Sequence, residues 1–335
     1  IVVPGSLTGL LQSRLDRLPD TWKGVLQNSS VLGVEFMLSL YWKMLDKLFM
    51  GRCHTDVFDG LEEKKMLLGL LGEYDRKYLF RHILVHDAAY SSILSSNLVK
   101  LHRAAAEAIQ DLYSGEADRL SGMITHHYIR SGDDSLAVSW GFKAMDQLIG
   151  REKLKLSYEL EELLPRCYSG EELLDKTFRL FSHRARAFET LAERSKEKQL
   201  IDRMLSLAEE ADSDYFRAVA LKKRGTLNQY TGRINEGIED LKLSLSLVEK
   251  AGDRELLGVV LGNLGGLLAN QGKISEASTY IERAIEIHRE VGDRRSEGVM
   301  TMNLGIMSKN RGKTDEAMTL YHSALEIARE VGDRV

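Results

Sequence analysis

The segments 252–291 and 292–331 follow each other directly in the chain and are identical at about half of their positions. The first segment begins at Gly252, the second begins at Gly292, and the same Gly-Asp-Arg opening returns at Gly332. Self-similarity at a fixed period of this length is typical of proteins that stack one small structural unit on the next. Two earlier segments, 172–211 and 212–251, fit the same 40-residue frame.

Each segment predicts a pair of amphipathic helices, because its apolar residues recur every three to four positions. In the segment 252–291 these residues are Leu257, Val260, Leu261, Leu264 and Leu268, followed by Ile274, Ala277, Ile281, Ala284 and Ile285. A turn between the two helices is predicted by glycines that recur at one position of the repeat, Gly232, Gly272 and Gly312.

A second glycine series falls in the middle of the first helix of each pair, at Gly225, Gly265 and Gly305. Glycine inside a helix costs about 1 kcal/mol relative to alanine. Because this cost recurs at one position of the repeat, we expect the two helices of a pair to approach closely there.

These segments resemble the tetratricopeptide repeat. The resemblance rests on Leu261, Leu264-Gly265, Ala277, Ile281 and Ala284, and again on Leu304-Gly305, Ala317, Tyr321 and Ala324. Thr301 departs from the pattern, and the linker Gly-Asp-Arg replaces the usual proline, which is similar to the longer 40-residue subclass. The resemblance implies a right-handed α-solenoid with a concave face that is formed by the first helices and recognises other polypeptides.

Residues 1–113 do not repeat. Apolar spacing predicts helices over 7–18, 21–31, 35–48 and 57–71, and the segment 73–80 predicts a short hairpin. Three helices followed by a short wing form the pattern of a winged-helix domain.

The same region is similar to the segment that follows the nucleotide-binding domain in bacterial signalling ATPases of the AAA/STAND type. In that family the ATPase is coupled to adenylate or guanylate cyclase, kinase or transcription-factor outputs, and its nucleotide site would lie before residue 1. The positions that carry the resemblance are Leu18-Pro19, Leu32-Gly33-Val34-Glu35-Phe36, Phe80-Arg81-His82, Ala89-Tyr90, Leu101-His102 and Ala106.

The predicted fold is therefore all-α, with a winged-helix-like domain over 1–113, connecting helices over 114–171 and tetratricopeptide repeats over 172–335. The chain begins at Ile1 without a methionine and stops at Val335, within the opening of another repeat. We expect both ends to be cuts through a larger protein.

Composition excludes several classes of function. The chain has a net charge of -4, which argues against a surface that binds nucleic acid or membrane by bulk charge. It has no run of 18 apolar residues. Cys53 and Cys167 form no motif for a disulfide framework or a zinc site, and such sparse cysteines favour a reducing cytoplasm.

Residues 1–110 carry 13 Lys and Arg against 12 Asp and Glu, whereas a DNA reader usually shows a basic stripe. We therefore interpret the winged-helix-like domain as a protein-packing domain. A DNA-binding transcription regulator that uses this domain is the alternative.

Sequence motifs for catalysis or metal binding lack their context. The stretch Arg311-Gly312-Lys313-Thr314 contains Gly-Lys-Thr, but its position matches the repeat turn and no strand precedes it. The pair His82 and His86 has metal-binding spacing but no third ligand, and the adjacent His126 and His127 point in different directions on a helix. We expect no enzyme activity, no cofactor and no metal.

The remaining candidate site is the concave face, where we expect a protein or peptide partner, either a neighbouring domain of the same protein or a separate molecule. Asparagine recurring at one inward position could hydrogen-bond the backbone of an extended peptide. Asn270 and Asn310 have an alternative role at helix ends before the turn glycines. The predicted partner-binding residues are Lys223, Gln229, Tyr230, Asn263, Asn270, Asn303 and Asn310.

Overall fold

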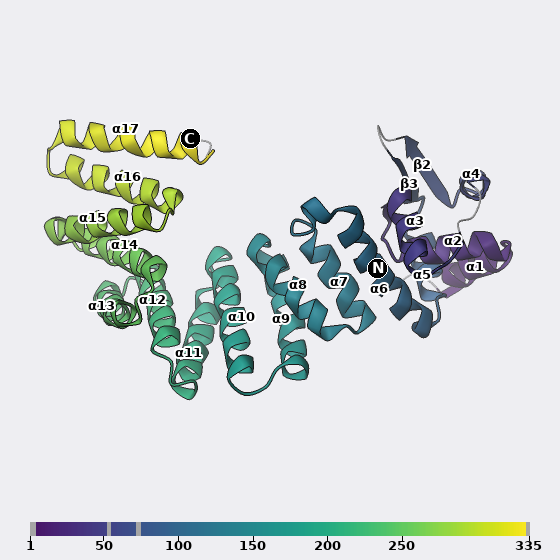
Figure 1. The fold of residues 1–335 in the computed structure, drawn as a ribbon, viewed down its shortest axis with the longest axis horizontal. Coiled ribbons are helices and arrows are strands. Elements are labelled where there is room, and N and C mark those ends of the chain that lie inside the picture. Colours follow the sequence, from purple (N-terminus) through teal and green to yellow (C-terminus); the bar gives the residue numbers. More distant parts are fainter. Residues whose placement is uncertain (1–4, 52–54, 72–74, 333–335) are drawn as a thin grey trace. The chain divides into compact units, whose positions relative to one another are not determined.

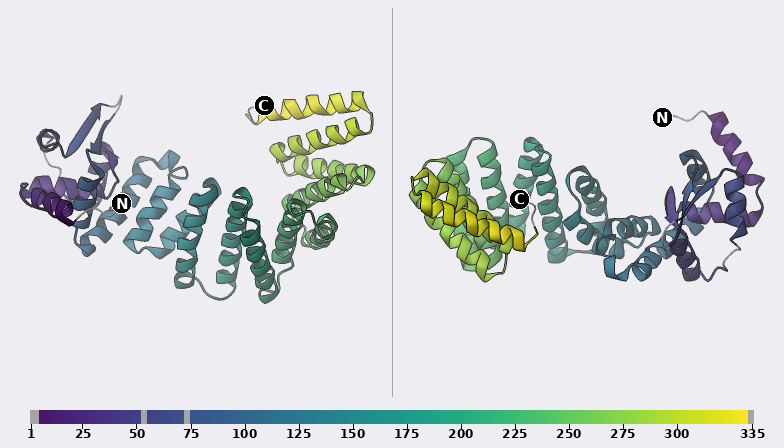
Figure 2. Two further views of the ribbon diagram at one scale, coloured as in Figure 1. Left: turned by 180° about the vertical axis from the view of Figure 1, so that it is seen from behind. Right: turned by 90° about the horizontal axis from the view of Figure 1, so that it is seen from above.

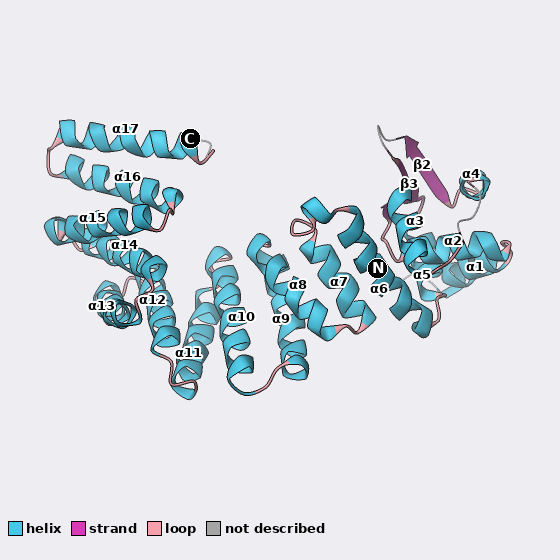
Figure 3. Ribbon diagram, in the orientation of Figure 1, coloured by secondary structure: helices cyan, strands magenta, loops and turns pink. Residues whose placement is uncertain are grey.

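The computed structural model describes residues 5–51, 55–71 and 75–332 (Figure 1). The chain divides into two compact units, Ile1–Tyr168 and Ser169–Val335. Within the described residues the structure is helical apart from one three-stranded sheet in the first unit (Figure 3). Cys53 lies outside the described residues.

The first unit begins with a mixture of helices and strands and continues with helices alone. Its first part contains α1 (Gly5–Asp16), α2 (Asp20–Ser30), β1 (Glu35–Met37), α3 (Leu38–Lys47), α4 (Asp56–Glu63), β2 (Leu67–Leu71), β3 (Arg76–Phe80) and α5 (Ile83–Ser91). Its second part contains α6 (Ser95–Leu112), a short 3-10 turn (Ser114–Glu116), α7 (Ser121–Ser131), α8 (Asp134–Gln147) and α9 (Gly150–Cys167).

The three strands form an antiparallel sheet in the order β1-β3-β2. Phe36 of β1 and Gly69 of β2 are both paired with Tyr78 of β3. Two helix predictions were therefore too long at this place: residues 35–37 form a strand, and the helix predicted over 57–71 ends at Glu63. Tertiary pairing with β3 overrides the local apolar pattern in both segments. The predicted hairpin is present as β2 and β3, with residues 72–74 outside the description.

Four buried aromatic rings tie the sheet to its helices. Phe58 of α4 lies 4.7 Å from Tyr78 and 5.7 Å from Tyr41 of α3, measured between ring centroids. Phe36 stacks on Tyr78 at 5.9 Å. All four rings are at most 3% exposed. Tilted and offset contacts of this kind add to the apolar burial that fixes α3 and α4 on one face of the sheet.

The described part of the second unit consists of eight helices in four antiparallel pairs, coloured from teal through green to yellow in Figure 2. The pairs are α10 (Gly170–Thr190) with α11 (Arg194–Glu210), α12 (Asp214–Tyr230) with α13 (Ile234–Ala251), α14 (Arg254–Asn270) with α15 (Ile274–Glu290), and α16 (Arg294–Asn310) with α17 (Thr314–Glu330). These pairs coincide with the four repeat segments identified in the sequence.

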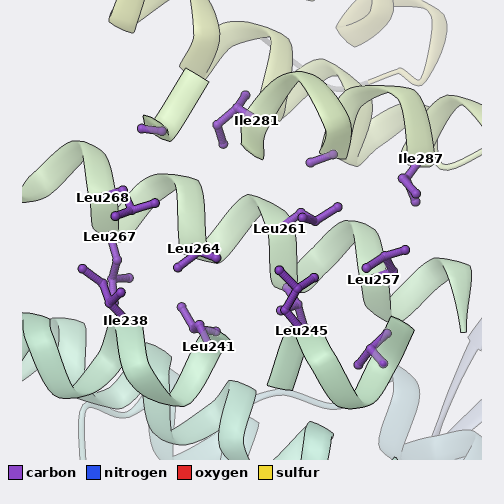
Figure 4. Close-up of a cluster of buried hydrophobic side chains, with 14 of the residues drawn as sticks. Ile238, Leu241, Leu245, Leu257, Leu261, Leu264, Leu267, Leu268, Ile281 and Ile287 are labelled. Carbon is purple, nitrogen blue, oxygen red and sulfur yellow. The ribbon is translucent and has the colours of Figure 1, made fainter. Parts of the chain in front are cut away.

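The apolar faces of consecutive pairs merge into one core (Figure 4). Leu261 and Leu264 of α14 are fully buried, with Leu241 of α13 on one side and Ile281 of α15 on the other. Each helix therefore uses one apolar face twice, against its own partner and against the neighbouring pair. This shared burial is the reason that one pair alone cannot bury its surface.

The mid-helix glycines lie where the two helices of a pair touch. A Cβ atom at Gly265 would lie 2.7 Å from Cγ1 of Ile281 and 3.1 Å from the backbone oxygen of Ala277. Gly225 and Gly305 meet their partner helices at similarly short distances. The predicted close approach is confirmed.

The turn glycines have the expected left-handed backbone. Their φ angles are +76° at Gly232, +81° at Gly272 and +77° at Gly312. Gly312 therefore belongs to a repeat turn, and the lysine of the Gly-Lys-Thr stretch, Lys313, pairs with Glu316 at 2.8 Å. No described helix is long and apolar enough to cross a membrane.

Two adjacent glycines of α14 provide a matched test of the close approach. We expect Gly265→Ala to lower the free energy of unfolding, because overpacking costs about 1–3 kcal/mol and exceeds the gain of about 1 kcal/mol in helix propensity. Gly266→Ala should raise the unfolding free energy by up to about 1 kcal/mol, because a Cβ atom there meets nothing within 4 Å. Urea unfolding of both variants measures the difference, and equal effects would contradict the packing described here.

Candidate functional site

Four of the seven predicted partner-binding residues line one pocket of the second unit. Lys223, Gln229 and Tyr230 come from α12, and Asn263 comes from α14. The pocket has a volume of about 250 Å³. It lies on the surface formed by the solvent-facing sides of α10, α12, α14 and α16, which we call the first-helix surface.

The other three predicted residues lie elsewhere on the first-helix surface. Asn270 and Asn310 are the exposed last residues of α14 and α16, a position that also suits their alternative role at helix ends. Asn303 lies half-buried in the middle of α16. The structure does not bring these three into the pocket.

The pocket also contains residues that the sequence analysis did not single out. These are Ala185 and Glu189 of α10, Glu197 of α11, and Lys222 and Thr226 of α12. Charged and amide groups therefore dominate its lining.

One wall of the pocket is held by an ion pair. Nη1 of Arg194 donates to Oε2 of Glu197 at 2.8 Å and to the backbone oxygen of Glu189 at 3.2 Å. Glu197 is only 3% exposed, and this burial raises the pKa of its carboxyl group against the opposing effect of Arg194. The guanidinium of Arg194 also lies over the ring of Tyr230, 4.4 Å from the centroid. These contacts fix the positions of Arg194 and Glu197.

Two adjacent lysines, Lys222 and Lys223, also line the pocket. Nζ of Lys223 donates to the backbone oxygen of Ser182 at 3.2 Å. Burial, together with the neighbouring charge of Lys222, lowers the pKa of Lys223 to about 7. Burial also lowers the pKa of Lys222.

The amide of Asn263 completes the site. Its Nδ2 donates to Oγ1 of Thr226 at 3.3 Å, which links α14 to α12. This bond orients one predicted residue toward the pocket but uses one of its donors. The mid-helix position of Asn263 thus serves the contact between neighbouring first helices as well as the pocket.

Two charged residues of the pocket depart from the repeat pattern. Lys222 stands where the next two segments have Gly262 and Met302. In the 40-residue frame, Glu197 occupies the position that carries Ala277 and two other small residues in the later segments. Stacking the repeats therefore does not require these charges. An alignment of the four segments would have found Lys222 and Glu197 from the sequence, because they are charged residues at positions where other segments carry small or apolar residues.

The histidines singled out in the sequence lie in the first unit, and His86 and His127 have structural partners there. Nε2 of His86 contacts the backbone oxygen of Ser30 at 2.9 Å, while His82 is exposed at the start of α5. Nδ1 of His127 lies 2.9 Å from Nδ1 of His102, and the hydroxyl of Tyr90 lies 2.8 Å from Nε2 of His102. The described residues contain no group of three or more side chains suited to a metal ion.

Comparisons with known proteins match the repeats. Residues 216–290 and 300–331 match families described as tetratricopeptide repeat, covering α12 to α15 and most of the last pair. The second unit carries tetratricopeptide repeats. No curated protein matches the chain significantly in sequence.

Several solved structures share the fold at low identity. Aspartyl phosphate phosphatase F from Bacillus subtilis is 15% identical over 99% of this chain and 77% of its own, with a TM-score of 0.52. BtubC (BKLC) from P. vanneervenii is 14% identical over 73% of this chain and 94% of its own, with a TM-score of 0.49.

A third similar structure is a signal transduction ATPase with numerous domains (STAND) from Pyrococcus horikoshii that has a tetratricopeptide repeat sensor. It is 13% identical over 98% of this chain, with a TM-score of 0.44. The chain spans about half of that protein, 53% of its length. At these identities the likeness concerns the fold alone.

The paired histidines predict a pH dependence of stability. Burial lowers the pKa of His102 to about 4 and that of His127 to about 3, whereas both titrate near pH 6.5 when unfolded. Unfolding therefore takes up protons below about pH 6.5, and the free energy of unfolding should fall as the pH drops from about 6.5 toward 4.

Urea unfolding of the chain at several pH values between 5 and 6.5 measures this slope. We expect His127→Gln to reduce it by up to about one proton. The variant His82→Gln, at an exposed histidine, serves as the control and should leave the slope unchanged. An unaltered slope in His127→Gln would show that the buried pair does not titrate on unfolding.

Replacing Lys222 by the residue found at the same phase of the last segment should stabilise the protein. We expect Lys222→Met to raise the free energy of unfolding by about 0.5–2 kcal/mol, because it removes an ammonium group whose pKa is lowered by burial. The matched control is Lys250→Met at the exposed end of α13, with a change within about 0.5 kcal/mol. A destabilised Lys222→Met would mean that the lysine supports packing.

Proposed function

We propose that this chain is a non-catalytic protein-recognition and regulatory module whose partner binds the first-helix surface. The pocket between Glu197 and Lys222 serves as the anchor of that surface. The observation that supports this proposal is that two charged residues of the pocket, Lys222 and Glu197, stand at positions where the later repeats carry small or apolar residues. Binding surfaces keep such residues at some expense of stability.

We further propose that the first part of the first unit is a winged-helix domain that packs on protein. Its element order of helix, strand, two helices and two strands supports this assignment, with β2 and β3 as the wing. The helix before the wing, α4, has the sequence DVFDGLEE, with four carboxylates and no lysine or arginine. Arg76 of β3 pairs with two of these carboxylates, those of Asp59 and Glu62.

This charge pattern disfavours the alternative of a DNA-binding transcription regulator. A helix that enters a DNA groove must approach phosphates, which an acidic helix repels. A gel-shift experiment that shows salt-sensitive binding of the chain to DNA would support that alternative.

The larger context that we propose is a bacterial cytoplasmic signalling ATPase, with a cyclase as its output. This part rests on the sequence resemblance carried by positions between Leu18 and Ala106 and on the sparse cysteines. In this arrangement the repeats hold a neighbouring domain, or release it when a ligand occupies the first-helix surface. Such a ligand works only through a difference in its affinity for the two states.

Site-specific photo-crosslinking tests the proposed binding surface. The photoreactive residue p-benzoylphenylalanine replaces Tyr230, which is 58% exposed on α12, in the natural full-length protein within its own cells. We expect a discrete crosslinked product, either to another domain of the same protein or to a separate polypeptide.

The control places the same residue at Leu243, which is 43% exposed on α13, away from the first-helix surface. It should give no such product. Equal crosslinking from both positions, or none from position 230, would overturn the proposal. Mass spectrometry of the product distinguishes an internal contact from a separate partner.

A further inference from the structure

The outer strand of the wing, β2, has an open edge. The sheet order β1-β3-β2 places β2 on the outside, and no other strand of the described residues pairs with it. An open edge presents a row of unpaired N–H and C=O groups, which can pair with another extended chain. Edge strands usually avoid such pairing by carrying a proline or a charged residue. The sequence of β2 is LLGLL, which contains neither.

The hydrogen bonds of the hairpin determine which residues face this edge. The backbone N of Arg81 donates to the backbone oxygen of Met66 at 2.9 Å. In an antiparallel pair, residues that bond the partner strand alternate with residues that do not. Leu68 and Leu70 therefore bond β3. The backbone groups of the remaining residues of β2 face the open edge, and these residues are Leu67, Gly69 and Leu71.

The sequence of β2 reads the same in both directions, with Gly69 at its centre. Two antiparallel copies of the strand that pair around this residue place glycine opposite glycine and leucine opposite leucine. Because Gly69 is one of the residues that face the edge, the two glycines form a hydrogen-bonded pair on the two-fold axis. One strand edge then serves both copies, as a two-fold interface requires.

The side chains on the outer face of β2 favour this pairing. Leu68 is 40% exposed and Leu70 is 45% exposed, and both lie on the same face of the strand. In the two-fold arrangement Leu68 of each copy lies opposite Leu70 of the other. These are the non-hydrogen-bonded pairs, in which side chains approach most closely. The pairing therefore buries apolar surface that a single copy leaves exposed.

The charges at the two ends of β2 are complementary in an antiparallel arrangement. The exposed Lys64 and Lys65 precede the strand, and Asp75 stands just before β3. Antiparallel pairing brings the lysine end of one copy to the Asp75 end of the other. Arg76, the next residue, is already paired with two carboxylates of α4 in its own copy.

We propose that β2 is a self-association surface, through which two copies of this chain join their sheets into one antiparallel sheet centred on Gly69. The partner is a second copy because the strand sequence, its open edge and its flanking charges are self-complementary. A contact through one strand of five residues is small, so the dimer dissociates on dilution. This inference goes beyond the proposed function, since it concerns the wing and not the first-helix surface, and either can fail alone.

Analytical ultracentrifugation of the full chain tests the association. We expect the weight-average mass to rise from that of one chain toward that of two as the concentration increases to about 100 μM, the range of a weak interface. A chain that keeps the mass of one copy throughout this range would show that the proposal is wrong.

Two double variants test the register of the pairing. In Leu68→Glu/Leu70→Glu the glutamates of the two copies lie opposite each other, and the dimer should be at least about tenfold weaker than that of the natural chain. In Leu68→Lys/Leu70→Glu each lysine lies opposite a glutamate of the other copy, and the dimer should be at least about tenfold tighter than that of the first variant. The two variants differ at position 68 alone.

The control is Leu243→Glu, at an exposed leucine of α13, which should leave the dissociation constant unchanged. Thermal unfolding of each variant establishes that it is folded. Equal association of the two double variants would place the contact elsewhere and overturn the proposal.

Residue-resolved hydrogen exchange distinguishes strand pairing from a contact of side chains alone. The amides of Leu67 and Gly69 should exchange slowly where the natural chain is a dimer and faster in Leu68→Glu/Leu70→Glu. The amides at positions 68 and 70, which bond β3, should be protected in both. Fast exchange of Leu67 and Gly69 in the dimer would contradict the proposal. Their protection in a chain with the mass of one copy would mean that another segment of the same chain covers the edge, and the proposal would be wrong.

Discussion

The contact between the two helices of each repeat, made at a glycine in the middle of the first helix, is the constraint on which the second unit depends. Gly265 lets α14 approach α15 until Ile281 lies against its backbone. That approach brings Leu261 and Leu264 into a core shared with the neighbouring pairs. Glycine lowers helix propensity at each repeat, but the apolar burial that it permits contributes more free energy than this loss.

Close packing of the repeats leaves the first-helix surface free to vary. Side chains on that surface do not take part in the shared core, so charges there cost only their own desolvation. The lysines of α12 use this freedom at one place. The position of Lys222 carries Gly262 or Met302 in later repeats, which shows that the fold tolerates neutral residues there. Assembly of the repeats therefore does not require the charge of Lys222.

The first unit is organised by different contacts. Its sheet is small, and the four aromatic rings around Tyr78 supply the burial that three short strands cannot. Further along, the contact of His102 with His127 joins α6 to α7 through two neutral rings. This contact uses polar groups in place of the glycine approach seen in the second unit. The stability of the first unit consequently depends on the protonation of these histidines. The stability of the repeats depends instead on the volume of the side chains at the helix contacts.

The sequence by itself determined the repeats, because a repeat period is a local property that needs no knowledge of distant contacts. It predicted the helix pairs, the left-handed turn glycines and the close approach at Gly265, and it singled out Lys223 and Asn263. Only the tertiary structure decided the strands at 35–37 and 67–71, because their pairing with β3 joins segments that are distant in the chain. It also decided the pocket, because Glu189, Glu197 and Lys222 come from three helices, which only the stacking of the repeats brings together.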